Sequence, residues 1–226
     1  MFSAVIFDFD GTIVDTEPIH FQAFQEVLAP LGLCFSWQNY LEGFLGLDDR
    51  DAFRKGFEQA GRSLSDADLD DLIGQKGQAF ARQASRVAPY PGAVELVRSI
   101  SDYLPTALCS GARRGDIEPV LALLGLTGCF DAMVTADEVA ASKPDPESYR
   151  EAVARLQEIF PAVLAATTLA VEDTPAGIAS ATGAGVKVMA VTNSYPRERL
   201  AGATWIVDSL SWDELSSSFA ARPACA

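Results

Sequence analysis

The segment Ala4-Val5-Ile6-Phe7-Asp8-Phe9-Asp10-Gly11-Thr12 joins a short apolar run to a turn that carries two carboxylates. Val, Ile and Phe clustered over four residues are typical of a buried strand, and Gly11 and Thr12 end it. In parallel α/β sheets, ligands bind beyond the carboxyl ends of the strands. Asp8 and Asp10 therefore lie where a site is expected, and such a pair can bind a hard cation or divide nucleophilic from acid–base work.

Strand-like and helix-like runs alternate from residue 90 onward. The expected strands lie at residues 106–109, 132–135, 168–171, 188–191 and 205–207, with helical patterns between them. Repeated strand-then-helix units predict an α/β fold in which helices cover both faces of a parallel sheet. We therefore expect a Rossmann-like three-layer core with right-handed crossovers.

Residues 17–88 differ from the rest, because their apolar residues show helical spacing and no convincing strand run. The simplest explanation is an all-helical insertion between the first strand and the remaining strands. We expect a helical cap domain at 16–88 and a core domain formed by 1–15 and 89–226. Pro89-Tyr90-Pro91-Gly92 marks the return of the chain to the core.

The composition is that of an ordinary globular chain of 226 residues with 49% hydrophobic content. A formal charge of −14 argues against nucleic acid or an anionic membrane surface as the main partner. No run approaches the ~20 apolar residues of a membrane span, and no signal-peptide pattern opens the chain. We expect a cytoplasmic protein that is a monomer or a small homo-oligomer.

The cysteines are Cys34, Cys109, Cys129 and Cys225, and none of their spacings is CxxC. A zinc knuckle or a redox pair is therefore not indicated, and free thiols are expected.

Polar residues also follow three later strands of the predicted sheet. They are Ser110-Gly111, Lys143 within Lys143-Pro144-Asp145-Pro146, and the pair Glu172-Asp173. Each has a purely structural alternative: Asp-Gly is common in turns, Ser110 could cap a helix, Lys143 could be a solvated lysine, and acids favour helix N-termini. Four such motifs in order, each at the end of a predicted strand, favour a common site.

With these motifs the chain resembles the haloacid dehalogenase superfamily of aspartate-nucleophile phosphotransferases, over nearly its whole length. The helical insertion resembles the cap domain of that family. The most similar branch contains phosphoglycolate phosphatase-like and β-phosphoglucomutase-like proteins. Asp10 argues against dehalogenation, because halide leaves without a proton donor whereas phosphoryl transfer to or from an alcohol needs one.

The resemblance implies a role for each carboxylate. Asp8 would be the nucleophile that forms an aspartyl-phosphate, and Asp10 would be the general acid and base. Mg²⁺ would bind the carboxylates of Asp8 and Asp173 and the backbone carbonyl of Asp10. Glu172 would contribute to the metal site directly or through water.

The resemblance also implies how the phosphoryl group is held. Ser110 and Lys143 would bind its oxygens, and Lys143 would offset the charge between the phosphate and Asp8. We also expect substrate contacts from three residues that adjoin these motifs, which are Gly11, Thr12 and Gly111.

Three cap residues are candidates for substrate contact. His20 is the only histidine, and Arg50 and Lys76 are the cations best placed to bind a second substrate anion. Each could equally be an ordinary helix residue. Asp48-Asp49 departs from the small or basic loop residues that the resemblance leads us to expect, which argues against a strongly anionic distal group. Thr16-Glu17 at the cap hinge could contact substrate or start the first cap helix.

These observations predict a Mg²⁺-dependent phosphatase that acts on a small phosphorylated metabolite, either a sugar phosphate or phosphoglycolate. A phosphomutase of the β-phosphoglucomutase type would use the same residues but return the phosphoryl group to a second hydroxyl. A binding or regulatory module that keeps the fold without turnover is the alternative from another class.

Overall fold

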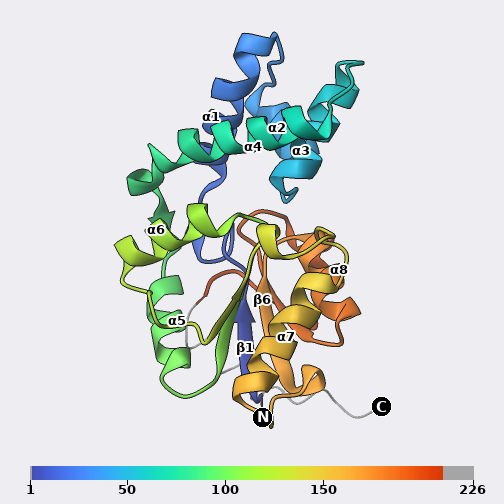
Figure 1. Ribbon diagram of the computed structural model, residues 1–226. Helices are drawn as coiled ribbons and strands as arrows, with labels where there is room; N and C mark the ends of the chain where they lie inside the picture. Colours follow the sequence, from blue (N-terminus) through green and yellow to red (C-terminus); the bar gives the residue numbers. More distant parts are fainter. Residues whose placement is uncertain (1, 211–226) are drawn as a thin grey trace.

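The computed structural model describes residues 2–210, which form a layered core with a group of helices above it (Figure 1). Within these residues one sheet of six parallel strands has the order β5-β4-β1-β6-β7-β8. The strands are β1 (Ala4–Phe7), β4 (Thr106–Cys109), β5 (Ala132–Val134), β6 (Thr168–Glu172), β7 (Lys187–Val191) and β8 (Trp205–Val207). Each strand expected from the sequence is confirmed.

The central strand β1 lies between β4 and β6. The order of the strands reverses there, because β4 and β5 lie on one side of β1 whereas β6, β7 and β8 lie on the other. Such a switch point opens a crevice at the carboxyl ends of the strands. Asp8 is the first residue after β1 and so lies at that crevice.

Helices cover both faces of the sheet, which confirms the three-layer α/β core. One face packs on α5 (Ala93–Ser101) and α6 (Arg114–Leu124), and the other on α7 (Glu147–Ile159) and α8 (Pro175–Gly183). Along β1, Val5 and Phe7 belong to the first layer and Ala4 and Ile6 to the second. Because successive strand side chains point to opposite faces, a fully apolar β1 serves both layers at once.

The cap consists of α1 (Glu17–Leu28), α2 (Trp37–Gly43), α3 (Asp49–Gln59) and α4 (Asp66–Ala81). These helices have an apolar cluster of their own, which includes Phe24, Leu28, Tyr40, Phe53 and Leu72. Two short strands, β2 (Val14–Asp15) and β3 (Ala88–Pro89), pair antiparallel where the chain enters and leaves the cap. The cap boundaries at residues 16 and 88 stay a prediction. β2 lies next to the first boundary and β3 lies at the second.

Short 3-10 helices complete the described chain. They are η1 (Ala29–Leu31), η2 (Ala84–Arg86), η3 (Ala136–Glu138), η4 (Ala165–Thr167) and η5 (Arg197–Leu200). No helix in residues 2–210 combines the length and apolar character needed to cross a bilayer. Cys34, Cys109 and Cys129 are free thiols, and Cys225 lies outside the described residues.

The start of α8 is packed against the end of β6. Thr174 caps the helix by accepting a hydrogen bond from the backbone N–H of Gly177, at 3.0 Å. A Cβ atom on Gly177 would lie 2.0 Å from the Glu172 carboxylate, which is fully buried. Only glycine therefore lets α8 approach this side chain so closely.

We expect Gly177→Ala to destabilise the protein by about 1–3 kcal/mol, because overpacking forces a buried charged group to move. Gly74→Ala in α4 is the matched control, since a Cβ there meets nothing within 4 Å. It should leave stability equal or slightly higher, because alanine favours helix interiors. Urea unfolding of both variants measures the difference, and equal midpoints would contradict the close approach.

Candidate active site

The ends of β1, β4 and β6 bring together residues that are far apart in the sequence. Lys143 lies on the loop between η3 and α7, and its ammonium Nζ lies 2.6 Å from Asp8 Oδ1 and 2.7 Å from Glu172 Oε1. It also donates to the backbone carbonyl of Cys109, at 3.1 Å. A single buried ammonium thus joins the carboxyl ends of three neighbouring strands.

Lys143 stays charged in this environment. Burial disfavours the ammonium form, but the carboxylates of Asp8 and Glu172 outweigh burial and hold the pKa of Lys143 well above its usual value. The solvated-lysine alternative does not describe this residue, because its side chain is only 10% exposed.

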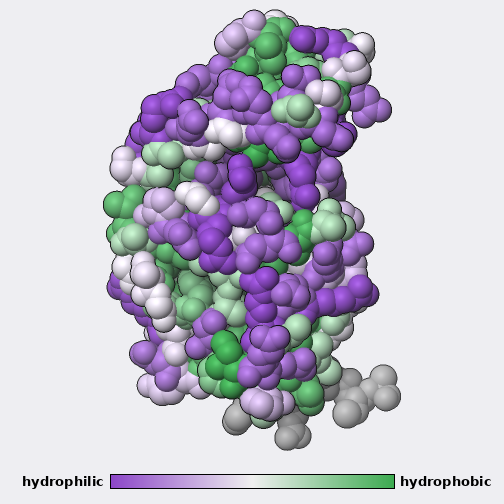
Figure 2. All heavy atoms as spheres, in the orientation of Figure 1, coloured by the Kyte–Doolittle hydropathy of each residue, from purple (hydrophilic) through white to green (hydrophobic). Residues whose placement is uncertain are grey.

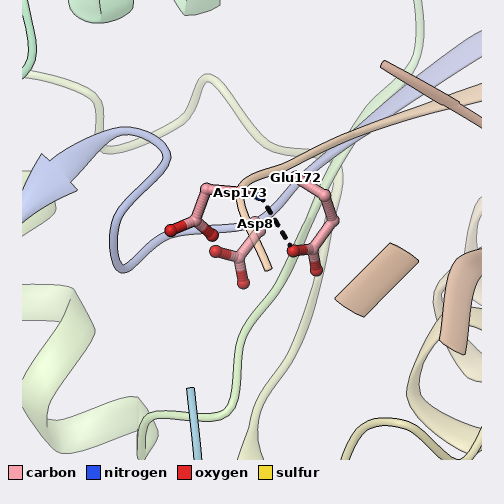
Figure 3. A group of neighbouring side chains, drawn as sticks. All are labelled: Asp8, Glu172 and Asp173. Carbon is pink, nitrogen blue, oxygen red and sulfur yellow. Dashed lines mark hydrogen bonds between the residues drawn. The ribbon is translucent and has the colours of Figure 1, made fainter. Parts of the chain in front are cut away.

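Three carboxylates meet at the same place, as Figure 3 shows. Ligand oxygens of Asp8, Glu172 and Asp173 lie within 4.8 Å of one another, and all three residues are buried. Burial raises the pKa of Asp8, with Lys143 opposing the rise. Burial, together with the charges of Asp8 and Glu172, raises the pKa of Asp173 well above its usual value. One ammonium does not balance three carboxylates, so the site favours an additional cation.

Asp173 presents a buried oxygen to this site. Its Oδ2 has no hydrogen-bond partner, whereas Oδ1 accepts a long hydrogen bond from Thr12 Oγ1 at 3.4 Å. Gly11, in a left-handed conformation with φ of 78°, leaves room here, because a Cβ would lie 1.9 Å from Asp173 Oδ2. An unpartnered carboxylate oxygen beside other hard oxygen donors fits a divalent cation such as Mg²⁺.

Glu172 differs from its two neighbours, because protein donors occupy both of its oxygens. Oε1 accepts from Lys143 and from the hydroxyl of Tyr149, at 2.9 Å for the latter. Oε2 accepts from the backbone N–H of Asp173, at 3.1 Å, and from Thr174. These contacts favour a role in holding Lys143 and the turn after β6, and direct metal binding by Glu172 stays a prediction.

Asp10 accepts hydrogen bonds from three side chains. Oδ1 accepts from Thr16 Oγ1 at 2.6 Å and from His20 Nε2 at 3.2 Å, and Oδ2 accepts from Ser110 Oγ at 3.0 Å. Burial opposes ionisation, but these hydrogen bonds, with that from His20 the largest, lower the pKa of Asp10 to about 2. Asp10 is therefore held as a carboxylate. Ser110 Oγ also accepts a hydrogen bond from the backbone N–H of Ala112, at 2.9 Å. The same hydroxyl therefore binds the backbone after β4 and the carboxylate of Asp10.

The cap reaches Asp10 through a buried lysine. Lys76 is 1% exposed, and its Nζ lies 2.7 Å from His20 Nδ1, 2.8 Å from Asp49 Oδ1 and 3.9 Å from Asp116 Oδ2. An ammonium can only donate, so His20 Nδ1 accepts and His20 Nε2 carries the hydrogen that is donated to Asp10. Lys76 thus links the cap helices to the general acid–base candidate.

Arg50 connects the cap to the core instead of facing the pocket. Its guanidinium donates to Asp48 at 3.1 Å and to the backbone carbonyls of Ala136 and Val139 at 3.4 Å. On the core side, Ser142 Oγ donates to Asp48 Oδ2 at 2.9 Å. These contacts hold the start of α3 against the loop that carries Lys143.

A pocket lies between the cap and the core, and hydrophilic side chains gather along this junction on the face shown in Figure 2. Its lining includes the predicted site residues Asp8, Asp10, His20, Ser110, Gly111 and Lys143. The other predicted substrate ligands, Gly11, Thr12, Arg50 and Lys76, do not line it, and their roles stay predictions.

Two residues that position this site were not identified from the sequence. Tyr149 binds Glu172, and Asp116 approaches Lys76. Tyr149 looks like any apolar position of α7, and Asp116 looks like a first-turn acid of α6. No local pattern marks either, because their partners come from distant elements.

Comparisons with known proteins identify the family of this chain. A family model described as haloacid dehalogenase-like hydrolase matches residues 5–191. The protein CbbY of Rhodobacter capsulatus is 32% identical and covers 92% of this chain and 93% of its own. Fructose-1-phosphate phosphatase YqaB of Escherichia coli is 34% identical, and the match covers 84% of this chain and 96% of that protein. A crystal structure of a CbbY variant from Rhodobacter sphaeroides in complex with xylulose-(1,5)bisphosphate has a similar fold, with a TM-score of 0.82 and 25% sequence identity. This match covers 92% of the present chain and 95% of that one.

We expect Lys76→Met to destabilise the protein by about 3–5 kcal/mol, because it leaves the buried carboxylate of Asp116 and the partly buried carboxylate of Asp49 without their cation. Adding Asp116→Asn should restore part of this loss. Arg54→Met is the control, since its partner Asp66 is 89% exposed and the pair contributes at most about 1 kcal/mol. Denaturant unfolding measures all three, and a Lys76→Met variant as stable as the control would contradict this network.

Proposed function

Because this chain belongs to the haloacid dehalogenase-like hydrolase family, we propose that it is a Mg²⁺-dependent phosphatase that hydrolyses a small sugar phosphate through an aspartyl-phosphate. One observation carries the proposal: Asp8 lies buried at the end of the central strand, beside the ammonium of Lys143, with Asp10 two residues later. Relatives named as phosphatases support phosphoric monoester hydrolysis as the reaction.

In the first step Asp8 attacks phosphorus. Lys143 binds Oδ1, and no donor within residues 2–210 binds Oδ2, which is the oxygen that we propose as the nucleophile. A bond forms between this oxygen and phosphorus while the bond from phosphorus to the substrate alcohol breaks. Asp10 gives its proton to the departing alkoxide.

In the second step a water molecule attacks the phosphorus of the aspartyl-phosphate. Asp10, now a carboxylate, accepts the proton from this water, the bond to Asp8 breaks, and inorganic phosphate leaves. The hydrogen bonds from Thr16, His20 and Ser110 favour the carboxylate form that this step needs. A bound phosphate dianion beside Asp10 would raise its pKa, since like charges disfavour ionisation, and so prepare it for the first step.

Lys143 and Ser110 are the side chains that we propose bind the phosphoryl oxygens, because both line the pocket beside Asp8 and Asp10. Asp8 and Asp173 would hold the Mg²⁺ ion, whose charge would neutralise the buried carboxylates and polarise the phosphoryl group. Glu172 would keep Lys143 in place.

The cap would exclude water from the pocket while the phosphoryl group is transferred. Arg50 and Asp48 hold it against the core by way of Ala136, Val139 and Ser142. Substrate entry and product release would require these contacts to open, which is the usual work of such a lid.

We expect Asp8→Asn to abolish hydrolysis of p-nitrophenyl phosphate in the presence of Mg²⁺, by at least about a thousandfold, because an amide cannot act as the nucleophile. Circular dichroism should remain that of the wild type. The matched control is Asp102→Asn, at an exposed position of the core, which should keep full activity.

Wild-type rates in Asp8→Asn would show that another group attacks phosphorus. Product analysis with β-glucose 1-phosphate tests the hydrolytic outcome separately. Free phosphate is expected, whereas glucose 6-phosphate would identify a phosphomutase.

We expect Mg²⁺ to raise the melting temperature of the wild type but not of Asp173→Asn, because binding to the folded state alone stabilises it. Without a divalent cation, Asp173→Asn should be the more stable protein. A carboxyl whose pKa is raised on folding destabilises the folded state at neutral pH, and the substitution removes it. Differential scanning calorimetry with EDTA or MgCl₂ gives both results. Equal Mg²⁺ shifts in the two proteins would exclude Asp173 as a ligand.

A further inference from the structure

We infer that the alcohol part of the substrate is an uncharged polyol, and that Glu17 and Asp49 disfavour a second phosphate at the cap end of the pocket. This inference rests on the proposed phosphatase function and specifies its substrate class. It concerns the end of the pocket opposite the strand ends, where the cap helices contribute the lining.

The two ends of the pocket differ in charge. The core end contains Lys143 and the carboxylate group that would hold a cation. The cap end contains Glu17, Asp48 and Asp49, with the rings of Phe24 and Tyr40 beside them. Among the described residues that line the pocket, Lys143 is the only lysine or arginine. Within the lining of this pocket, a phosphate at the cap end would therefore meet carboxylates and no lysine or arginine, whereas Arg50 and Arg113 line a neighbouring pocket.

The nearest cap cations are already committed elsewhere. Lys76 is 1% exposed and bonded to His20 and Asp49. Arg50 binds Asp48 and core carbonyls and does not line the pocket. Both ring nitrogens of His20 are occupied, Nδ1 by Lys76 and Nε2 by Asp10, so His20 has no free donor for a second anion. Each of these groups would have to leave a buried partner to bind a second anion.

Two carboxylate oxygens remain able to accept hydrogen bonds at this end. Tyr40 donates to Glu17 Oε2 at 2.8 Å, and Lys76 pairs with Asp49 Oδ1 at 2.8 Å. Within residues 2–210, no hydrogen-bond donor is found for Glu17 Oε1 or Asp49 Oδ2. Both residues are partly exposed and line the pocket. Substrate hydroxyls can donate to them, whereas a phosphate dianion can only accept.

This charge pattern also bears on the mutase alternative. A phosphomutase must hold a sugar bisphosphate with either phosphate at the distal end of its pocket. Carboxylates placed there would repel that intermediate, whereas a hydrolase needs only one phosphate site. The cap end thus favours release of phosphate over its return to the sugar.

The test compares substrates that share a reacting end and differ at the distal end. Fructose 1-phosphate is paired with fructose 1,6-bisphosphate, and mannitol 1-phosphate with mannitol 1,6-bisphosphate. For the wild type with Mg²⁺, we expect kcat/KM of each bisphosphate to be lower than that of its monophosphate by at least about tenfold. Substrates that turn over too slowly are measured as competitive inhibitors of p-nitrophenyl phosphate hydrolysis.

Variants then assign the effect to the two carboxylates. Glu17→Gln and Asp49→Asn should each raise the bisphosphate-to-monophosphate ratio of kcat/KM by at least about fivefold, because the repulsion is reduced while the shape is kept. The ratio is compared within each variant, so a change in overall rate does not affect it. Asp51→Asn is the control, because Asp51 is an exposed acid in the same first turn of α3 and should keep the wild-type ratio.

Three results would overturn the inference. The first is a wild type that uses the bisphosphates as well as the monophosphates. The second is an unchanged ratio in both Glu17→Gln and Asp49→Asn. The third is a protein that cleaves p-nitrophenyl phosphate but neither hydrolyses nor binds any of the four sugars. Loss of p-nitrophenyl phosphate hydrolysis itself would instead remove the proposed function, so the two failures are distinguishable.

Discussion

The ammonium of Lys143 between Asp8 and Glu172 is the interaction on which the site depends. Parallel pairing of β1 with β6 places these carboxylates side by side at the carboxyl ends of the two strands, where burial raises the pKa of Asp8. A buried cation offsets much of that penalty, and a fully satisfied Glu172 keeps this cation in position. Asp173 is left with an unpartnered oxygen beside two further carboxylates, which is the arrangement that supports the proposed Mg²⁺ site.

A second buried lysine organises the cap in a similar way. Lys76 pairs with Asp49 of the cap, approaches Asp116 of the core and fixes the tautomer of His20, which donates to Asp10. The contacts between cap and core thus extend to the hydrogen bonding of Asp10, the proposed general acid–base. Lys76 is used in this way, and Arg50 holds the cap to the core. Neither neutralises the carboxylates that line the distal end of the pocket. The same set of charges thus positions Asp10 and underlies the proposed preference for an uncharged distal group.

The fold and the core motifs could be predicted because they are local. Runs of three to five mostly apolar residues mark each strand of the main sheet, and Asp8 and Ser110 follow such runs directly, with Asp173 one residue beyond the apolar run of β6. The fates of Arg50 and Lys76 could not be predicted, because a sequence shows their charges but not the partners that neutralise them. Asp48 and Asp49 adjoin Arg50 in the chain. The contact of Ser142 with Asp48 and that of Asp116 with Lys76, however, form only when the cap packs on the core. Tyr149 shows the same limit, since its hydroxyl meets Glu172 only when α7 packs on the sheet.

The central claim is that Asp8 itself forms a covalent bond to phosphorus. Acid quenching during turnover of p-nitrophenyl phosphate, followed by borohydride reduction, converts an acyl phosphate into an alcohol and leaves free carboxylates unchanged. Mass spectrometry of the peptide that contains Asp8 and Asp10 then locates the modified residue. Homoserine is expected at position 8, and only when substrate is added. An unmodified position 8 under turnover, or homoserine at position 10 instead, would contradict this claim.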